Sequence, residues 1–297
     1  MKILVTGSNG QLGQELRKLS QMYRDHEFIF TDIPELDITN RHSVDRFFMD
    51  AKPEAVINCA AYTAVDKAET DPSLAFELNG VSVGHLALNA SKIGAIFIHI
   101  STDYVFDGTK STPYTEEDVP NPQSLYAKSK YQGELETQKF ATRGIIFRTS
   151  WLYSEFQNNF VKTILNKGSE RGQLNVVYDQ VGSPTCAEDL AEAILTILPS
   201  LKDLNGVEIY HYSNEGVASW YDFAKDIVEL SGIRCEISAI LTEQYPLPAR
   251  RPAYSIMDKS KIRKQFGIEI PYWRESLRKC VETITNNELR ITNKGKK

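Results

Sequence analysis

The sequence has few of the residues that cross-link small proteins or bind metals. Four cysteines and five histidines are spread through 297 residues. They form no C-x-x-C pair and no local spacing typical of a zinc site. We therefore predict no metal site from these side chains and expect the cysteines to be reduced thiols. The cysteines are Cys59, Cys186, Cys235 and Cys280.

Long apolar runs and an excess of basic residues are also lacking. No apolar stretch approaches the roughly 20 residues that span a bilayer, and the N-terminus enters a strand pattern without a signal peptide. The formal net charge is −5, whereas a nucleic acid or an anionic membrane requires a basic surface. The sequence thus predicts a cytoplasmic protein with no nucleic-acid and no membrane partner.

A glycine-rich turn, Gly7-Ser8-Asn9-Gly10-Gln11-Leu12-Gly13, follows the β-branched run of residues 2–6. Leucines then recur at helical spacing, which predicts a strand, a turn and a helix. Such a turn lets the backbone approach a pyrophosphate, and the helix N-terminus offers unpaired N–H groups. The spacing is G-x-x-G-x-x-G, not the strict G-x-G-x-x-G, so a turn that only packs a helix on a sheet is the alternative. The predicted dinucleotide contacts are Gly7, Asn9, Gly10, Gln11, Leu12 and Gly13.

Asp32 ends a second apolar run, residues 27–32. It follows the glycine turn by about the interval at which a carboxylate reaches the adenosine ribose. Such a carboxylate accepts hydrogen bonds from a diol and repels a 2′-phosphate, which favours NADH over NADPH. Asp37 and Ile38 are placed along the adenine edge. For both acids, an ordinary surface carboxylate is the alternative.

Short apolar strands alternate with amphipathic helices through the first half of the chain. Further runs at residues 55–60, 95–101 and 144–150 follow the first two strands, and helical stretches cover 74–93 and 126–141. This alternation is typical of an α/β fold, the Rossmann-type doubly wound parallel sheet. Ligands of such a sheet bind outside the carboxyl ends of its strands.

The pattern becomes less regular after residue 150. We predict a dinucleotide-binding Rossmann domain over residues 1–150, with the sheet extended by strands near 174–178 and 209–213. Residues 151–297 are expected to form mainly a smaller C-terminal substrate-binding lobe. The polar tail after Asn287 is expected to fray.

Tyr126 and Lys130 are spaced to share one face of a helix, and Thr102 lies at the end of a strand. A free tyrosine titrates near ~10, and a nearby ammonium favours the phenolate and lowers that pKa. Thr102 would donate a hydrogen bond to a carbonyl oxygen that gains charge as hydride arrives. We predict these three residues as catalytic, with Tyr126 and Lys130 also lining the cofactor. A core tyrosine with a solvated lysine is the alternative.

Five longer stretches carry a resemblance to a known family: residues 58–69, 101–108, 148–153, 179–185 and 251–255. They cover nearly the whole chain except the final tail. With them the chain resembles the extended short-chain dehydrogenase/reductases, in particular those that form dTDP-L-rhamnose for cell-surface polysaccharides. The resemblance implies NADPH- or NADH-dependent reduction of the 4-keto group of a nucleotide-linked 6-deoxy sugar, with the dTDP-sugar dTDP-4-dehydro-L-rhamnose as substrate.

The resemblance also assigns residues. It implies that Tyr126 is the proton donor, that Lys130 is its partner and that Thr102 tunes it. Some members of the family form homodimers around Mg²⁺, for which Glu15, Glu188 and Asp189 are available here; ordinary surface acids are the alternative. The implied dinucleotide contacts include Ala60, Ala61, Tyr62 and Thr63, and the implied sugar contacts are Thr102, Asp103, Tyr104, Trp151 and Arg251.

Two other interpretations stay open. One is another nucleotide-sugar reaction on the same scaffold, such as 4,6-dehydration or epimerisation. Related dehydratases carry a Thr-Asp-Glu run where this chain has Thr102-Asp103-Tyr104, and the missing Glu counts against dehydration. Related epimerases use an extra acid/base pair, for which Cys186 is a candidate. The other is a non-catalytic NADP-binding regulatory subunit, against which the intact Thr102, Tyr126 and Lys130 argue.

Overall fold

A six-stranded parallel sheet forms the centre of the larger part of the molecule. The computed structural model describes residues 1–294, with side chains through residue 287. The strand order is β10-β5-β4-β3-β1-β2, and all neighbours are parallel. This confirms the Rossmann-type doubly wound α/β fold. The strands are β1 (Lys2–Thr6), β2 (Glu27–Thr31), β3 (Ala55–Asn58), β4 (Ile96–Thr102), β5 (Arg143–Thr149) and β10 (Gly206–His211).

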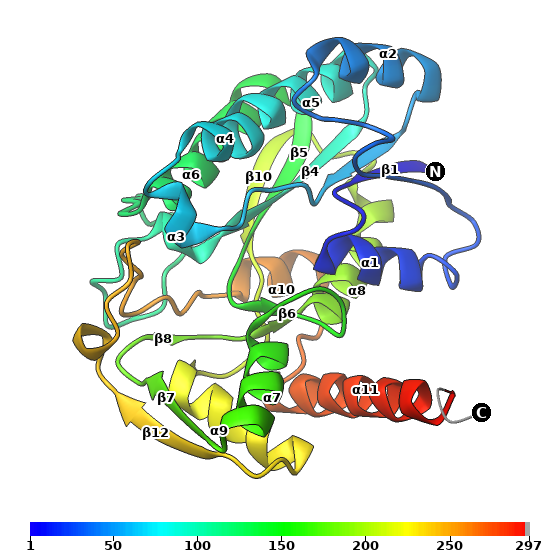
Figure 1. Ribbon diagram of the computed structural model, residues 1–297. Coiled ribbons are helices and arrows are strands. Elements are labelled where there is room, and N and C mark those ends of the chain that lie inside the picture. Colours follow the sequence, from blue (N-terminus) through cyan, green and yellow to red (C-terminus); the bar gives the residue numbers. More distant parts are fainter. Residues whose placement is uncertain (295–297) are drawn as a thin grey trace.

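Helices cover both faces of the sheet because successive strand residues point to opposite sides. Ile3 and Val5 pack on one side with the leucines of α1 and the apolar face of α8. Leu4, between them, packs on the other side against α2 and α5. Figure 1 shows α2, α5 and α6 on one side of the strands and α1 and α8 on the other. These helices are α1 (Gln11–Leu19), α2 (Arg41–Ala51), α5 (Ser82–Lys92), α6 (Leu125–Phe140) and α8 (Ala187–Ile197).

The helical stretch expected at 74–93 is interrupted. It consists of α4 (Ser73–Phe76), a π-helical turn η1 (Glu77–Val81) and α5. The widened turn directs the Asn79 side chain toward the loop after β3, where it binds both backbone polar groups of Tyr62. Such π turns often mark functional sites. The remaining short elements of this part are α3 (Val65–Ala68), η2 (Asp103–Val105) and η3 (Leu198–Leu201).

A second apolar core lies in the lobe formed mainly by residues after 150. Its strand β7 (Gln173–Val177) pairs in parallel with β12 (Glu236–Ile240). The expectation that a strand near 174–178 extends the main sheet is therefore wrong: the outer place beside β5 is taken by β10, and Leu174 and Val176 pack in the lobe core. The other lobe elements are β6 (Leu152–Tyr153), α7 (Phe160–Arg171), β8 (Val181–Gly182), β9 (Thr185–Cys186), β11 (Ala218–Ser219), α9 (Trp220–Ser231), η4 (Thr242–Gln244) and α10 (Ser260–Phe266).

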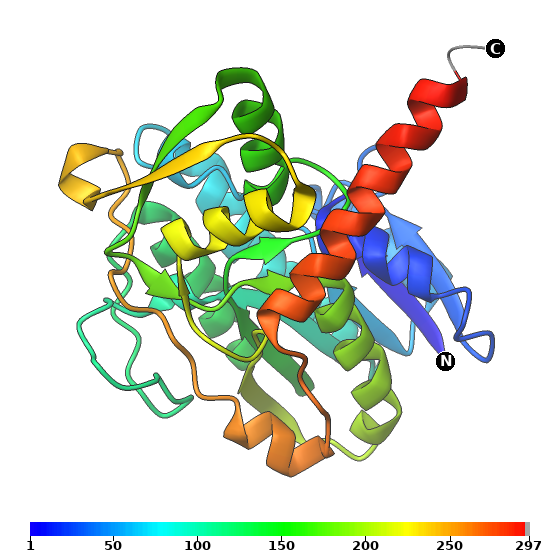
Figure 2. The same cartoon turned by 90° about the horizontal axis from the view of Figure 1, so that it is seen from below.

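The last helix, α11 (Trp273–Lys294), runs along the border of the lobe (Figure 2). It includes most of the tail that was expected to fray, and residues 295–297 lie outside the described part of the chain. The four cysteines are free. Among the described residues, no helix is both long and apolar enough to cross a membrane.

Candidate active site

The glycine-rich turn joins the end of β1 to the start of α1 in a conformation that needs glycine. Gly7 has φ +64°, and a Cβ there would lie 2.5 Å from the Cα of Ala60. A Cβ on Gly13 would lie 2.5 Å from the Cα of Ser8. α1 begins without a side-chain cap on its first N–H groups. The turn therefore offers a close backbone approach and free donors, which fit a pyrophosphate.

Other residues of the turn face different surroundings. The Leu12 side chain is buried in the core between sheet and helices. Gln11 extends to the lobe, where its Oε1 accepts from Asn159 Nδ2 at 3.0 Å. The Asn9 carbonyl accepts from Gln157 Nε2 at 2.7 Å. Part of this turn is thus already held by the lobe segment that follows β6.

Asp32 lies next to the turn, as expected. Its Oδ2 accepts a hydrogen bond from the backbone N–H of Asn9, at 2.9 Å. Asp37 instead closes its own turn by accepting from the backbone and hydroxyl of Thr39. The Ile38 side chain is buried among apolar residues of α2 and α5. Of the three, Asp32 is the one whose carboxylate meets the glycine turn.

The loop after β3, which contains Ala60, Ala61, Tyr62 and Thr63, is fixed between the turn and α6. The Asn79 side chain accepts from the Tyr62 N–H at 2.8 Å and donates to the Tyr62 carbonyl at 3.0 Å. It also donates to Ser129 Oγ on α6 at 3.0 Å. Asn79 was missed from the sequence because a single asparagine within a helical stretch gives no signal.

Tyr126 and Lys130 lie on the first turns of α6, which Ser124 caps by accepting from Ala127 N. The helix packs along β4, and Lys130 Nζ donates to the Ile100 carbonyl at 2.6 Å. Thr102 ends the same strand and is a hydrogen-bond partner of the Tyr126 phenol. The structure thus brings the three predicted catalytic residues together at the carboxyl edge of the sheet.

The pKa of Tyr126 is raised to about 12, chiefly by burial, while its hydrogen bond to Thr102 lowers it. This direction is opposite to the depression expected from Lys130. The Lys130 ammonium is itself buried, which lowers its pKa to about 8, and it binds a backbone carbonyl. The phenol is therefore held in its neutral form, which is the form that donates a proton.

A buried ion pair lies one helical turn beyond Lys130. Arg148 on β5 donates two parallel hydrogen bonds to Glu134, at 2.9 and 2.7 Å, and both side chains are at most 2% exposed. Ser101 also donates to the Glu134 carboxylate. That carboxylate raises the pKa of Lys130 against the effect of burial. The continued four-residue spacing from Tyr126 through Lys130 to Glu134 could have revealed this acid.

Asp103 and Tyr104 follow Thr102 in η2. Thr102 Oγ1 accepts from the Tyr104 N–H at 3.2 Å and is 3.1 Å from Asp103 Oδ1. The Tyr104 ring meets that of Tyr126 edge to face, with centroids 5.9 Å apart. The two tyrosines and Thr102 therefore form one continuous hydroxyl-bearing surface.

A groove of about 1570 Å³ extends from Tyr104 across the lobe. One wall carries Lys167 and Arg171 of α7, and another carries Arg250 and Arg251. Arg251 is held by Asp66 through two hydrogen bonds of 3.0 and 2.7 Å. The groove thus presents an excess of cations, which fits an anionic ligand. Arg251 was expected from the family resemblance, but the other three were not, since isolated basic residues on a helix or loop are usually solvated.

Trp151 turns the chain from β5 into the lobe with φ +48°. Its ring stacks on that of Trp220, with centroids 3.6 Å apart and planes 7° from parallel. Trp220 lines the groove. One face of Trp151 is therefore covered by protein, and Trp220 is the aromatic surface that the sequence did not predict.

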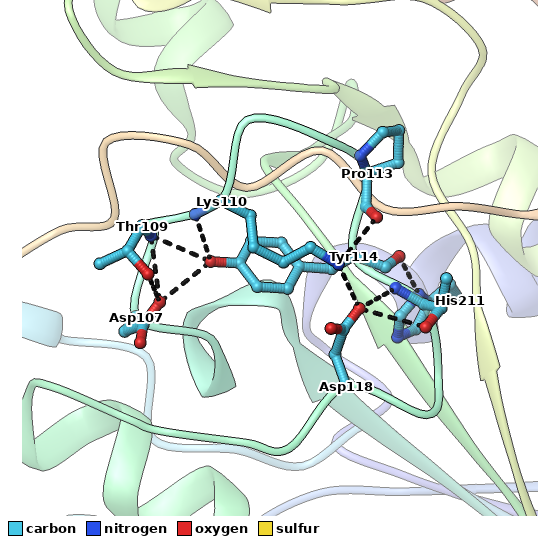
Figure 3. A network of polar contacts seen from close by, with 8 residues as sticks. Asp107, Thr109, Lys110, Pro113, Tyr114, Asp118 and His211 are labelled. Atoms are coloured by element: carbon cyan, nitrogen blue, oxygen red, sulfur yellow. Dashed lines mark hydrogen bonds and ion pairs between the residues drawn. The ribbon is translucent and has the colours of Figure 1, made fainter.

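The loop between η2 and α6 is fastened by its own polar network (Figure 3). Asp107 accepts from Thr109 and from the Tyr114 hydroxyl, and Lys110 pairs with Asp118 at 2.7 Å. The backbone of Tyr114 also forms hydrogen bonds with Ile256 and Asp258, which follow Arg250 and Arg251 of the groove wall. Because Asp107 and Thr109 line the groove, this network fixes one of its edges.

Comparison with known proteins agrees with this arrangement. Residues 1–286 match the protein family described as RmlD substrate binding domain. The chain belongs to the RmlD family. The dTDP-4-dehydrorhamnose reductase of Sinorhizobium fredii is 42% identical over 95% of this chain and 97% of that protein. The family membership confirms the resemblance drawn from the motifs.

Solved structures of RmlD-family proteins share the fold. A dTDP-4-dehydrorhamnose reductase from Clostridium acetobutylicum superposes with a TM-score of 0.91 at 42% identity, covering 96% of this chain and all of the other. The dTDP-4-dehydrorhamnose reductase from Bacillus anthracis, solved in complex with NADP, gives a TM-score of 0.90 at 36% identity and covers 94% of this chain and 98% of the other.

The Mg²⁺ expected for some RmlD-family proteins does not fit the residues of this chain. Lys18 Nζ lies 3.6 Å from Glu15, 2.9 Å from Glu155 and 3.0 Å from Glu188. An ammonium thus already occupies the space between these carboxylates, and Asp189 is bound to an amide and a hydroxyl. Within the described residues, no group of His, Cys, Asp and Glu side chains could hold a metal ion. The Mg²⁺ expectation is therefore not supported.

Proposed function

We propose that this protein is an NADPH-dependent reductase that converts dTDP-4-dehydro-L-rhamnose to dTDP-L-rhamnose. The observation that carries the proposal is the meeting of Thr102, Tyr126 and Lys130 at the sheet edge that also holds the glycine turn. The names of the relatives support the same reaction.

The chain's residues account for the proton that this reduction needs. NADPH, when bound, supplies the hydride to C4 of the sugar. The neutral phenol of Tyr126 then donates its proton to the oxygen on C4. Thr102 donates a hydrogen bond to that oxygen, where it stabilises the developing charge. Lys130, whose ammonium donates to the Ile100 carbonyl, would hold the nicotinamide ribose.

The two parts of the molecule divide the binding. In this proposal, residues 1–150 bind the dinucleotide through the glycine turn, Asp32 and the loop of Ala60 to Thr63. The fit is supported by the tight approach at Gly7 and by the uncapped start of α1. The NADP complex of a relative favours NADPH, whereas Asp32 beside Asn9 favours NADH. We propose NADPH as the cofactor.

Residues 151–297, which include Arg251, are the main part that binds the nucleotide sugar in this proposal. Lys167, Arg171 and Arg250 face the groove without a carboxylate partner among the described ion pairs, so they suit a diphosphate. Trp220 and Tyr104 provide flat faces for the sugar, with Asp103, Trp151 and Arg251 as the further predicted contacts. A homodimer and a cytoplasmic location, where the four free thiols stay reduced, remain predictions of this proposal.

The test is NADPH absorbance with dTDP-4-dehydro-L-rhamnose, compared with the GDP- and UDP-linked sugars. Tyr126→Phe should lower turnover by roughly 10²–10⁴, the range for loss of a general acid, with little change in NADPH affinity. Full turnover in Tyr126→Phe would remove the phenol from the mechanism. Equal rates with all three nucleotides would remove the dTDP assignment.

A further inference from the structure

Asp103 is a buried acid for which the fold supplies no cation. Its side chain is 1% exposed, and its Oδ2 has no hydrogen-bond partner. No Lys, Arg or His forms an ion pair with it in the described part of the chain. Burying an unpaired carboxylate is costly, and such a group keeps its proton instead.

The groups that face Asp103 are hydroxyls and the backbone N–H groups of Asp103 and Tyr104. Thr102 and Ser255 act on its carboxyl as hydrogen-bond partners, and Tyr104 and Tyr126 are the titratable neighbours. Arg251, a cation that acts on the neighbouring Tyr104, is paired with Asp66. A negative charge on Asp103 would therefore be stabilised by dipoles alone.

The protonation of Asp103 decides what the Thr102 hydroxyl can do. This hydroxyl has a single proton and already accepts the Tyr104 N–H. Its oxygen lies 3.1 Å from Asp103 Oδ1, a separation that suits a hydrogen bond in either direction. An ionised Asp103 accepts a hydrogen bond from the Thr102 hydroxyl. A neutral Asp103 instead donates a hydrogen bond to Thr102, so the Thr102 proton can point toward Tyr126 and the substrate.

We propose that Asp103 is a positioning residue that works as a neutral acid: it donates to Thr102 and thereby directs the Thr102 proton to the oxygen on C4 of the substrate. This inference rests on the proposed reductase function. It assigns to Asp103 a role through Thr102 that is separate from any contact with the sugar.

The pKa of Asp103 agrees with this geometry, because burial raises it to about 7. Below that pH the acid is neutral and Thr102 can donate. Above it, the carboxylate accepts the Thr102 hydrogen bond, so Thr102 no longer donates to the substrate and the rate of reduction should fall by about tenfold per pH unit. Lys130, with a pKa of about 8, titrates close by, and the test must separate the two groups.

The first test compares pH profiles of kcat/KM for the wild type and Asp103→Asn. An amide N–H at this position donates to Thr102 at every pH, and its carbonyl can accept from Ser255. Whatever its effect on the rate at the plateau, Asp103→Asn should move the alkaline limb upward by about one pH unit, to the limb set by Lys130. An unmoved limb would overturn the proposal.

A double-mutant cycle tests whether Asp103 acts through Thr102. In the Thr102→Val background, Asp103→Asn should have no further effect on kcat and should leave the pH profile unchanged. A pH profile that Asp103→Asn still shifts in the Thr102→Val background would show that Asp103 does not act through Thr102, which would also overturn the proposal. A wild type that does not reduce the dTDP-sugar would instead contradict the proposed function.

A second measurement does not depend on activity. Aspartate labelled with ¹³C at the carboxyl carbon allows each side chain to be titrated by NMR in the wild-type protein. One resonance should titrate near pH 7, should shift in Thr102→Val and should be missing from Asp103→Asn. If the resonance that shifts in Thr102→Val titrates below about 5, as ordinary aspartates do, Asp103 is ionised at neutral pH and the proposal is wrong.

Discussion

Asp103 and Glu134 are carboxyl groups with the same 1% exposure. Asp103 lies beside Thr102, and Glu134 lies one helical turn beyond Lys130 on α6. Glu134 receives two hydrogen bonds from Arg148 and one from Ser101. Asp103 receives no cation, and one of its oxygens has no partner. Equal burial therefore produces two different groups: an ion pair that holds α6 against β4 and β5, and an acid that keeps its proton.

The two carboxyl groups differ in charge because they lie at different distances from the proposed position of the substrate oxygen. Glu134 lies two helical turns along α6 from Tyr126, where a fixed charge supports Lys130 without meeting the reacting atoms. Asp103 adjoins Thr102, where a permanent negative charge would oppose the charge that develops on the substrate oxygen. A neutral acid avoids that repulsion and still orients a hydroxyl.

The largest effect is expected for Glu134→Leu. This change leaves the buried Arg148 guanidinium without its carboxylate, so the free energy of unfolding should fall by about 3–5 kcal/mol. Urea denaturation measures it, with Ser101→Ala as the matched control that removes one hydrogen bond, worth about 1 kcal/mol. Glu134→Leu combined with Arg148→Met should recover much of the loss. A loss below about 1 kcal/mol in Glu134→Leu would mean that the pair does not stabilise the fold.

Asp103→Asn should change stability in a manner that depends on pH. Because the pKa of Asp103 is raised from 3.8 to about 7, the folded protein keeps a proton that the unfolded chain releases over that interval. Relative to Asp103→Asn, the unfolding free energy of the wild type should fall by about 1.4 kcal/mol per pH unit from about pH 4 to about pH 7, then stay level. A difference that is constant from about pH 4 to 7 would show that Asp103 is ionised throughout.

The smallest effect is expected at Asp32, a half-exposed carboxylate that accepts from the N–H groups of Asn9 and Ile33. Asp32→Ala removes a charge that repels a 2′-phosphate. That repulsion is about 1 kcal/mol in water, so the ratio of kcat/KM for NADPH over NADH should rise about fivefold. If the ratio is unchanged in Asp32→Ala but changes in Asp37→Ala, Asp37 contacts the ribose instead.

The sequence predicted the parts of the site whose signals are local. The glycine turn, the spacing of Tyr126 and Lys130, and the strand that ends at Thr102 each depend on a short stretch, and the structure brings them to one edge of the sheet. The strand expected near 174–178 is present as β7, but its expected place in the main sheet is wrong because an apolar run indicates only that a strand is buried. It does not specify the partner, which here is β12, more than sixty residues further along.

The groove and the buried pair depend on contacts between distant residues. Arg148 sits in an apolar strand run, and its partner Glu134 lies on a helix, so neither position alone indicates an ion pair. Lys167 and Arg171 lie on a single helix, where a sequence pattern does not distinguish them from solvated residues, whereas in the fold they line the same groove as Arg250. Similarly, the direction of the Tyr126 pKa depends on how much water the neighbouring loops exclude, which a sequence pattern does not specify.

In the proposed reaction, the hydride of NADPH ends at C4 of a dTDP-linked sugar and stays there. The direct measurement uses NADPH deuterated at the transferable position of the nicotinamide, dTDP-4-dehydro-L-rhamnose as substrate, and NMR of the sugar product. We expect dTDP-L-rhamnose with deuterium at C4, formed in equal amount to the NADP produced. A product with no deuterium at C4, or a sugar altered without consumption of NADPH, would exclude this reaction.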